Sequence, residues 1–218
     1  MPPIPACPLN ICNNADTAKR FDQGPSLLLM PEFFHEAFTD LDTTMQNEGI
    51  HLLKCNPNYR IWYSDAHTLD MTTDLTQMKA ELERYADRGE EEEGGEGEDP
   101  LVFDHFLAFL RESGRHYQLS CAYVLRTSFD TIFSMLRPEM LRSLGELHPF
   151  ESLYARVSRY FRTERLRQAF TFASMYLGMS PFDAPGTYSL LQFAEFAGGI
   201  WYPVGGFQKV RGHLFLGI

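Results

Sequence analysis

The sequence predicts an α+β protein that is mostly helical. Apolar residues recur at helical spacing through much of the chain from residue 99 onward, as at Phe103, Phe106 and Leu110. Two short runs bounded by turn residues, 51–55 and 59–63, predict strands. A chain of 218 residues, 44% of them hydrophobic, is long enough for a core of ordinary domain size.

The predicted helices begin and end at residues suited to those positions. Pro31 suits the first position of a helix, and Gly49 suits its end. Thr73 or Asp74 can cap the next helix. In the second half, helices are predicted over 103–110, 117–125, 131–136, 139–144, 153–162, 164–177 and from Thr187 to the glycines at 198–199.

The predicted strands are short and lie near both ends of the helical region. The first two are joined by a turn at Asn56-Pro57-Asn58. A third strand is expected near Thr68, and a fourth at 200–203, which runs into a turn at Gly205-Gly206.

Charge and cysteine usage exclude several classes of function. The net charge of -10 argues against a nucleic-acid partner, because Lys and Arg dominate phosphate binding. The four cysteines have no zinc spacing, so no metal site is predicted and reduced thiols in an intracellular protein are expected. The N-terminus does not resemble a signal peptide, and no apolar run is long enough to span a membrane. We therefore expect a soluble protein or one bound to a single membrane face.

No catalytic group can be named from residue types and spacing alone. The seven histidines are scattered singly, and neither a GxGxxG nor a Walker sequence occurs. Asp130 and Glu164 are candidates for handling protons, although solvated surface carboxylates are the favoured interpretation of both. The catalytic residues are therefore unknown at this point.

Aromatic and methionine side chains are concentrated between residues 170 and 207. The run includes Phe170, Phe172, Met175, Tyr188, Trp201 and Tyr202. Composition alone favours a hydrophobic core. The alternative is one wall of a long apolar tunnel, because aromatic rings and thioethers offer large polarizable surfaces with little polar cost.

The stretch 166–191, LRQAFTFASMYLGMSPFDAPGTYSLL, resembles phytoene desaturases of the bacterial and fungal type. The resemblance continues through GIWYPVGGF at 199–207 and extends upstream through 148–152 and 159–161. It also reaches FDQGP at 21–25, which looks like the family's flavin-proximal turn, and covers roughly residues 20–209.

The resemblance implies a partial flavoprotein fold, with a helical substrate domain and a remnant of the FAD-binding domain. The family's phosphate-cradling strand, Gly-rich turn and helix have no counterpart here, so we expect this chain alone to lack FAD and to be inactive. The implied organisation is 1–19 irregular without a family match; 20–66 remnant of flavin-domain and sheet elements; 67–199 helical substrate domain with a disordered acidic loop at 89–99; 200–209 return strand and Gly-Gly turn toward the flavin; and 210–218 a tail outside the family.

The resemblance also implies an activity and a set of site residues. The activity is FAD-dependent desaturation of phytoene, a carotenoid precursor, toward lycopene or more desaturated products. FAD carries the redox chemistry while the protein aligns a C–C bond and excludes water. Near the flavin the resemblance places Asp22, Gly24, Pro25, Gly205 and Gly206. Around the polyene it places Phe170, Phe172, Met175, Tyr188, Trp201 and Tyr202.

Two alternatives and a membrane hypothesis accompany this interpretation. The chain could be a non-catalytic module that binds an apolar isoprenoid, or part of another flavin amine oxidase-like oxidoreductase. Because phytoene is insoluble in water, peripheral membrane contact is expected. The arginines interleaved with aromatic residues are the suggested docking face: Arg156, Arg159, Arg162, Arg165 and Arg167.

Overall fold

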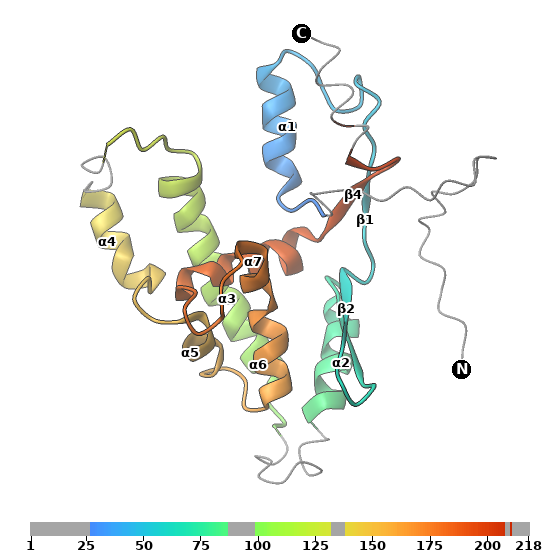
Figure 1. Ribbon diagram of the computed structural model, residues 1–218, viewed down its shortest axis with the longest axis vertical. Coiled ribbons are helices and arrows are strands. Elements are labelled where there is room, and N and C mark those ends of the chain that lie inside the picture. Colours follow the sequence, from blue (N-terminus) through green and yellow to red (C-terminus); the bar gives the residue numbers. More distant parts are fainter. Residues whose placement is uncertain (1–26, 87–98, 132–137, 208–209, 211–218) are drawn as a thin grey trace, which may run out of the picture. The chain divides into compact units, whose positions relative to one another are not determined.

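The computed structural model describes residues 27–86, 99–131, 138–207 and 210 (Figure 1). The chain forms two compact units. The first comprises Met1–Cys55 and Ile200–Ile218, and the second comprises Asn56–Gly199. The fold is mostly helical with small antiparallel sheets, as predicted.

The first unit joins an early and a late segment of the chain through a two-stranded sheet. Strand β1 (Leu52–Lys54) pairs antiparallel with β4 (Trp201–Pro203). Leu28 extends this pairing, since it exchanges two backbone hydrogen bonds of 2.9 Å with Trp201. Residues 27–30 are thereby fixed beside β4, although some 170 positions separate them in sequence.

Helix α1 (Pro31–Asp40) belongs to the same unit and begins at the predicted proline. The predicted end at Gly49 is wrong, because the chain leaves the helix at Leu41 and Asp42 takes a left-handed φ of 56°. Gly49 instead forms a turn with φ 67° before β1. Phe38 packs with three other buried side chains into a small core: Met45, Ile50 and Val210.

The second unit contains its own hairpin. Strand β2 (Tyr59–Trp62) pairs with β3 (Thr68–Met71), and Arg60 forms an ion pair with Asp70 across it. Both strands predicted at 51–55 and 59–63 are present, as β1 and β2. They do not pair with each other, because β1 pairs with β4 and β2 pairs with β3. Short strands carry little information about which partner they select.

Helices make up the rest of the second unit. They are α2 (Leu75–Ala86), α3 (Val102–Ser120), α4 (Pro138–Leu147), α5 (Leu153–Val157), α6 (Glu164–Thr171) and α7 (Ser189–Phe193). A π-helical turn, Cys121–Leu125, continues α3, and another, Ala194–Gly198, continues α7. Two 3₁₀ segments complete the set, Phe172–Leu177 and Gly186–Tyr188.

Several predicted helix limits differ from the structure. The helices expected at 103–110 and 117–125 form one continuous element. The helix runs through Gly114, where a side chain would collide with the ring of Phe193 on α7. The helix expected at 164–177 tightens into a 3₁₀ segment after Thr171, although it ends at Gly178 as predicted, with φ 63°. The helix expected at 153–162 ends at Val157. Most of the helix predicted at 131–136 lies outside the described residues.

Two predicted caps are present. Ser152 accepts a hydrogen bond of 3.2 Å from the Ala155 amide at the start of α5. Asp74 accepts bonds of 2.8 and 3.1 Å from the amides of Thr76 and Gln77 at the start of α2. Such caps satisfy backbone donors that have no partner inside the helix.

Asp99 departs from its expected place at the end of a disordered acidic loop. Residues 87–98 lie outside the described part of the chain, but Asp99 is buried and precedes α3. Its carboxylate accepts a hydrogen bond of 3.2 Å from the Leu101 amide and lies 3.0 Å from Nδ1 of His105. The acidic group therefore belongs to the helix start.

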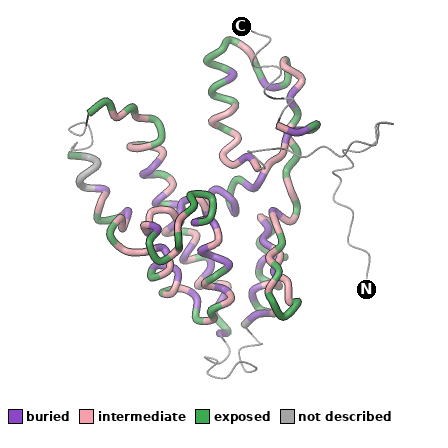
Figure 2. The backbone as a smooth tube through the Cα atoms, in the orientation of Figure 1, coloured by how far each residue is buried: buried purple, intermediate pink, exposed green. Residues whose placement is uncertain are grey.

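An aromatic cluster forms the centre of the second unit. Phe170 stacks on Phe161 with centroids 4.1 Å apart and an interplanar angle of 3°. Phe106, Phe109 and Phe196 surround it at 5.6, 5.7 and 5.7 Å. Figure 2 shows buried stretches along α3, which carries Phe106 and Phe109, and along α6, which carries Phe170.

A buried charge network lies beside this cluster. Arg156 is 5% exposed, and its guanidinium forms ion pairs with Glu112 on α3 and with Glu151. Tyr160 donates a hydrogen bond of 2.7 Å to Glu112. Burial alone would raise the pKa of Glu112, but the hydrogen bonds from Arg156 and Tyr160 bring it below its ordinary value. The pair therefore keeps its charges inside the fold.

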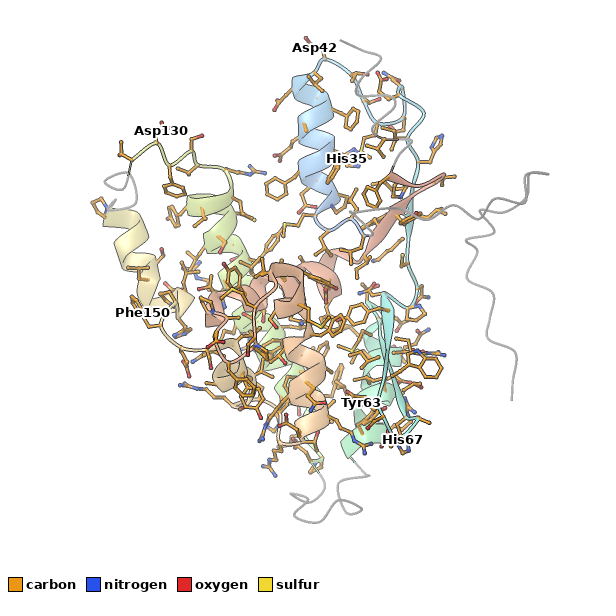
Figure 3. All side chains as sticks on the ribbon, in the orientation of Figure 1. His35, Asp42, Tyr63, His67, Asp130 and Phe150 are labelled. Atoms are coloured by element: carbon orange, nitrogen blue, oxygen red, sulfur yellow. The ribbon has the colours of Figure 1, made fainter. Side chains whose placement is uncertain are left out.

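We expect Phe170→Ala to destabilise the second unit by about 3–5 kcal/mol, because it removes a buried ring and leaves a cavity among four others. The matched control is Phe150→Ala, since Phe150 is 95% exposed (Figure 3) and its loss should change stability by less than about 0.5 kcal/mol. Urea unfolding of the purified variants measures both values. Equal stability of the two variants would contradict the assignment of Phe170 to the core.

Candidate functional site

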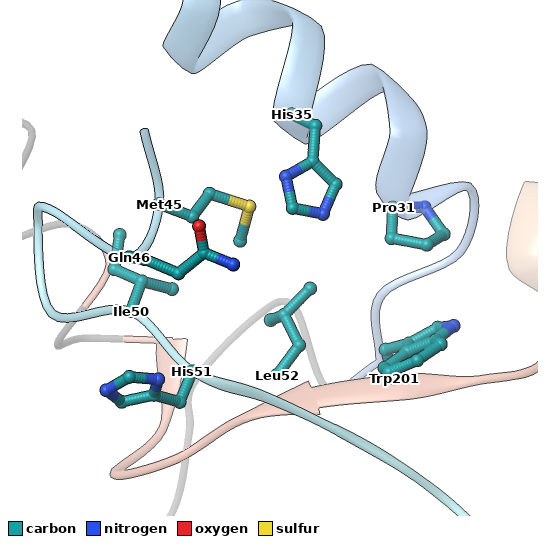
Figure 4. A pocket seen from close by; sticks show the side chains of 8 residues that line it. All are labelled: Pro31, His35, Met45, Gln46, Ile50, His51, Leu52 and Trp201. Atoms are coloured by element: carbon teal, nitrogen blue, oxygen red, sulfur yellow. The ribbon is translucent and has the colours of Figure 1, made fainter. Parts of the chain in front are cut away.

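A pocket of about 280 Å³ lies in the first unit beside β4. Figure 4 shows the imidazole of His35 pointing into it from α1, opposite Leu52, with the indole of Trp201 at its edge. The remaining lining residues are Pro31, Met45, Gln46, Ile50 and His51. Most of this lining is apolar, so the pocket suits a flat or apolar group better than an ion.

The predicted flavin-proximal residues are only partly described. Asp22, Gly24 and Pro25 lie outside the described residues. Gly205 and Gly206 follow β4 with φ of 89° and 85°, a left-handed conformation that favours glycine at both positions. A turn without side chains after a strand allows the backbone to approach a planar ligand closely.

The predicted polyene-binding residues fall into both units. Trp201 and Tyr202 lie on β4 in the first unit, and Trp201 lines the pocket. In the second unit, Phe170 is completely buried in the core and Tyr188 packs against that core. Met175 is 63% exposed, and Phe172 stacks on Tyr59 with centroids 5.3 Å apart.

Four large apolar side chains are exposed in a short stretch of the second unit. We call this set the apolar strip: Met175, Tyr176, Leu177 and Phe182. The first three end the 3₁₀ segment Phe172–Leu177, and Phe182 lies against Tyr154 at 4.5 Å. Exposed apolar side chains are candidates for contact with another apolar group where they form a contiguous patch.

Glu195 is a buried carboxyl group behind this strip. It lies in the π-helical turn Ala194–Gly198 and is 0% exposed. Tyr59 donates a hydrogen bond of 2.9 Å to Oε2, and the phenol of Tyr176 is a second neighbour of the carboxyl group. Oε1 has no hydrogen-bond partner among the described residues. Asn58 donates to the backbone carbonyl of Glu195 at 2.8 Å, which fixes the turn against the hairpin.

Burial is the main influence on the acidity of this group. It raises the pKa of Glu195 to about 7, against the lowering effect of the two phenols. Burial also raises the pKa of Tyr59 and of Tyr176, and the neighbouring Glu195 adds to both effects. A buried carboxyl group whose pKa is raised in this way is a candidate functional group.

Sequence reasoning missed Glu195 and considered two other carboxylates. Asp130 is exposed (Figure 3), and Glu164 is an exposed acceptor for the Tyr154 hydroxyl at 2.5 Å. The favoured interpretation of both as surface carboxylates is therefore confirmed. Glu195 had one sequence signal, because it is the only charged residue between Asp183 and Lys209.

Among the described residues, neither the buried histidine at 116 nor any cluster of metal-ligating side chains forms a second candidate site. His116 on α3 is buried, and its ring nitrogens lie 2.7 Å from Ser189 Oγ on α7 and 2.8 Å from the Glu146 carbonyl on α4. Burial lowers its pKa, so it serves as a neutral hydrogen-bonding link. Within the part of the chain that the structure describes, no three His, Cys, Asp or Glu residues gather as metal ligands.

Most of the arginines proposed as a membrane-docking face have acidic partners. Arg156 is buried and cannot reach a membrane surface. Arg159, Arg165 and Arg167 form ion pairs with Glu151, Asp65 and Glu164 respectively. Arg162 is exposed. The described helices include none with both the length and the apolar character needed to cross a bilayer.

We expect the free energy of unfolding to fall by about 3 kcal/mol between pH 4.5 and about 7, relative to a Glu195→Gln variant. In this interval the native state retains a proton on Glu195 that the unfolded chain, with an ordinary pKa of 4.5, has released. Urea unfolding at a series of pH values measures the difference. Glu164→Gln, which changes an exposed carboxyl, is the control. Parallel pH profiles for the wild type and Glu195→Gln would contradict the raised pKa.

The chain is similar to named proteins over most of its length. No family model matches it. It is 56% identical to a phytoene desaturase of Fusarium fujikuroi over 191 residues, which cover 88% of this chain and 31% of that protein. A Neurospora crassa phytoene desaturase is 50% identical over 192 residues, or 88% of this chain and 30% of the relative. A zeta-carotene-forming phytoene desaturase of Myxococcus xanthus is 35% identical over 190 residues, or 87% and 34%. The chain thus spans about a third of the length of these relatives, and over that segment it is a homologue of the phytoene desaturases of fungi and bacteria.

Proposed function

We propose that this chain contributes to an FAD-dependent desaturation of phytoene in carotenoid biosynthesis, toward lycopene or more desaturated products. The observation that carries the proposal is the 56% identity over 191 residues with a protein named phytoene desaturase. The apolar strip and the mostly apolar pocket beside Trp201 support it, because a hydrocarbon substrate needs extended apolar contact and few polar partners.

FAD, when bound, would supply the hydride acceptor. The residues described here that fit such a group are Gly205, which is exposed, and its buried neighbour Gly206; both have a left-handed φ and no side chain between the backbone and a ligand. We propose that they approach the flavin together with Asp22, Gly24 and Pro25. The support for this grouping is the pairing of Leu28 with Trp201, which places the segment after Pro25 and the segment before Gly205 in one sheet.

For the substrate, we propose Phe172, Met175 and Tyr188 in the second unit, and Trp201 and Tyr202 in the first. Phe170 is left out of this set because its ring is completely buried among other aromatic rings. Peripheral membrane contact belongs to the same proposal, because phytoene must be collected from a bilayer. Within the arginine-rich segment, Arg162 and Arg159 are exposed and are the cations proposed for that contact, although Arg159 also pairs with Glu151.

The proposal predicts that this chain can replace its counterpart in a complete enzyme. In the chimaera, the matched segment of the Fusarium fujikuroi phytoene desaturase is exchanged for this chain's sequence. Expressed in bacteria that accumulate phytoene, it should yield desaturated, coloured carotenoids, which chromatography of the extracted pigments identifies. The unaltered Fusarium enzyme is the positive control.

Two outcomes would count against the proposal. A folded chimaera that retains bound FAD but leaves phytoene unchanged would exclude desaturation by this segment. If the same chimaera still bound phytoene, as judged by titration, the chain would instead be a module for binding an apolar isoprenoid.

A further inference from the structure

The contact between α3 and α7 contains polar side chains that the aromatic cluster does not account for. At one end of this contact, His116 on α3 is hydrogen-bonded to Ser189, the first residue of α7. At the other end, Phe106, earlier on α3, meets Phe196, beyond the end of α7, with ring centroids 5.4 Å apart. The two segments therefore run in opposite directions along their contact.

Ser113 and Gln192 lie between these two ends. Ser113 comes one turn before the histidine of the hydrogen bond, and Gln192 comes one turn after its serine, so both side chains lie at the same level of the contact. Both residues are completely buried. At this level a Cβ atom on Gly114 would lie only 2.8 Å from Cε2 of Phe193, so the two helices are in close contact where they carry these polar groups.

The polar groups at this level lack hydrogen-bond partners in the part of the chain that the structure describes. Seven buried side-chain nitrogen or oxygen atoms in that part have none, and four of them belong to Ser113, Gln192 and Glu195. Glu195 follows Gln192 by three residues, is also completely buried, and has only its Oε2 bonded to Tyr59, at 2.9 Å. The four atoms, gathered in one place, indicate a shared partner: Ser113 Oγ, both amide atoms of Gln192 and Oε1 of Glu195.

Water has the size and the chemistry that these atoms require. A buried amide without a hydrogen bond carries a large desolvation cost. Proteins contain about one buried water for every 27 residues, and such waters typically make about three hydrogen bonds to groups that would otherwise be unsatisfied. Because water both donates and accepts, it can serve all four atoms. A cation could not bind the amide nitrogen of Gln192, and an anion would be repelled by the carboxylate of Glu195.

We propose that water molecules enclosed between α3 and α7 bridge the amide of Gln192 to Ser113 Oγ across the contact and to Oε1 of Glu195 along the chain. Gln192 is the central residue, because its amide both donates and accepts hydrogen bonds. The water supplies polar solvation at the carboxyl oxygen that Tyr59 leaves open. The site lies within the second unit and does not depend on the proposed desaturation.

Crystals of the 218-residue chain, at a resolution that shows ordered water, test the site directly. We expect electron density for water at about 2.7–3.2 Å from the Gln192 amide, from Ser113 Oγ and from Oε1 of Glu195. The lack of such density at any one of the three side chains, or a direct hydrogen bond between two of them, would overturn the proposal.

Urea unfolding tests the bridge between Ser113 and Gln192 in solution. Ser113→Ala and Gln192→Met each remove one end of the bridge and leave the other end poorly satisfied, so each should lower the urea midpoint by on the order of 0.5 M. The double variant should lose less than the sum of the two shifts, because both substitutions break one bridge. Gln118→Met, at an exposed position on α3, is the control and should leave the midpoint nearly unchanged.

Two results of the unfolding experiment would contradict the bridge. A higher midpoint in Gln192→Met would show that the amide has no partner in the native state, because removing an unsatisfied buried group is stabilising. Shifts that add fully in the double variant would show that Ser113 and Gln192 share no water.

Discussion

The stacking of Phe161 on Phe170 is the contact on which the second unit depends most. The two rings are parallel within 3° and come from separate helical segments, so their contact fixes α6 against the chain that follows α5. Phe106 and Phe109 bring α3 to the same point, and Phe196 brings the turn after α7. Because Glu195 precedes Phe196 directly, the position of the buried carboxyl group follows from the packing of the core. A substitution at Phe170 would therefore shift the carboxyl group of Glu195 as well as reduce the stability of the second unit.

Much of the secondary structure could be predicted because its signals are local. Pro31, Asp74, Ser152 and Gly178 each act within a few residues of their own position, and the structure has helix ends at all four. Strand pairing could not be predicted in the same way. Strand β1 has three residues and selects a partner about 150 positions away, a choice made by tertiary packing and not by its own sequence.

The candidate site was predictable in its apolar part and not in its polar part. The aromatic and methionine content of residues 170–207 identified the region, but it could not separate Phe170, which is enclosed, from Met175, which is exposed. That separation depends on the change from α-helix to 3₁₀ helix after Thr171, which alters the face that each later residue presents. Glu195 was overlooked because a single glutamate in a helix is usually solvated. Its burial depends on Tyr59, some 136 positions earlier.

The junction between α2 and α3 has a practical consequence for protein engineering. Lys79 on α2 lies over the ring of Phe103 on α3 at 5.8 Å, and apolar side chains of both helices share the main core. Asp99 separately secures the start of α3 through the Leu101 amide and His105. Both helices are therefore held in the second unit by contacts of their own. An affinity tag or a fluorescent reporter inserted between Ala86 and Asp99 should therefore leave the described contacts of α2 and α3 in place.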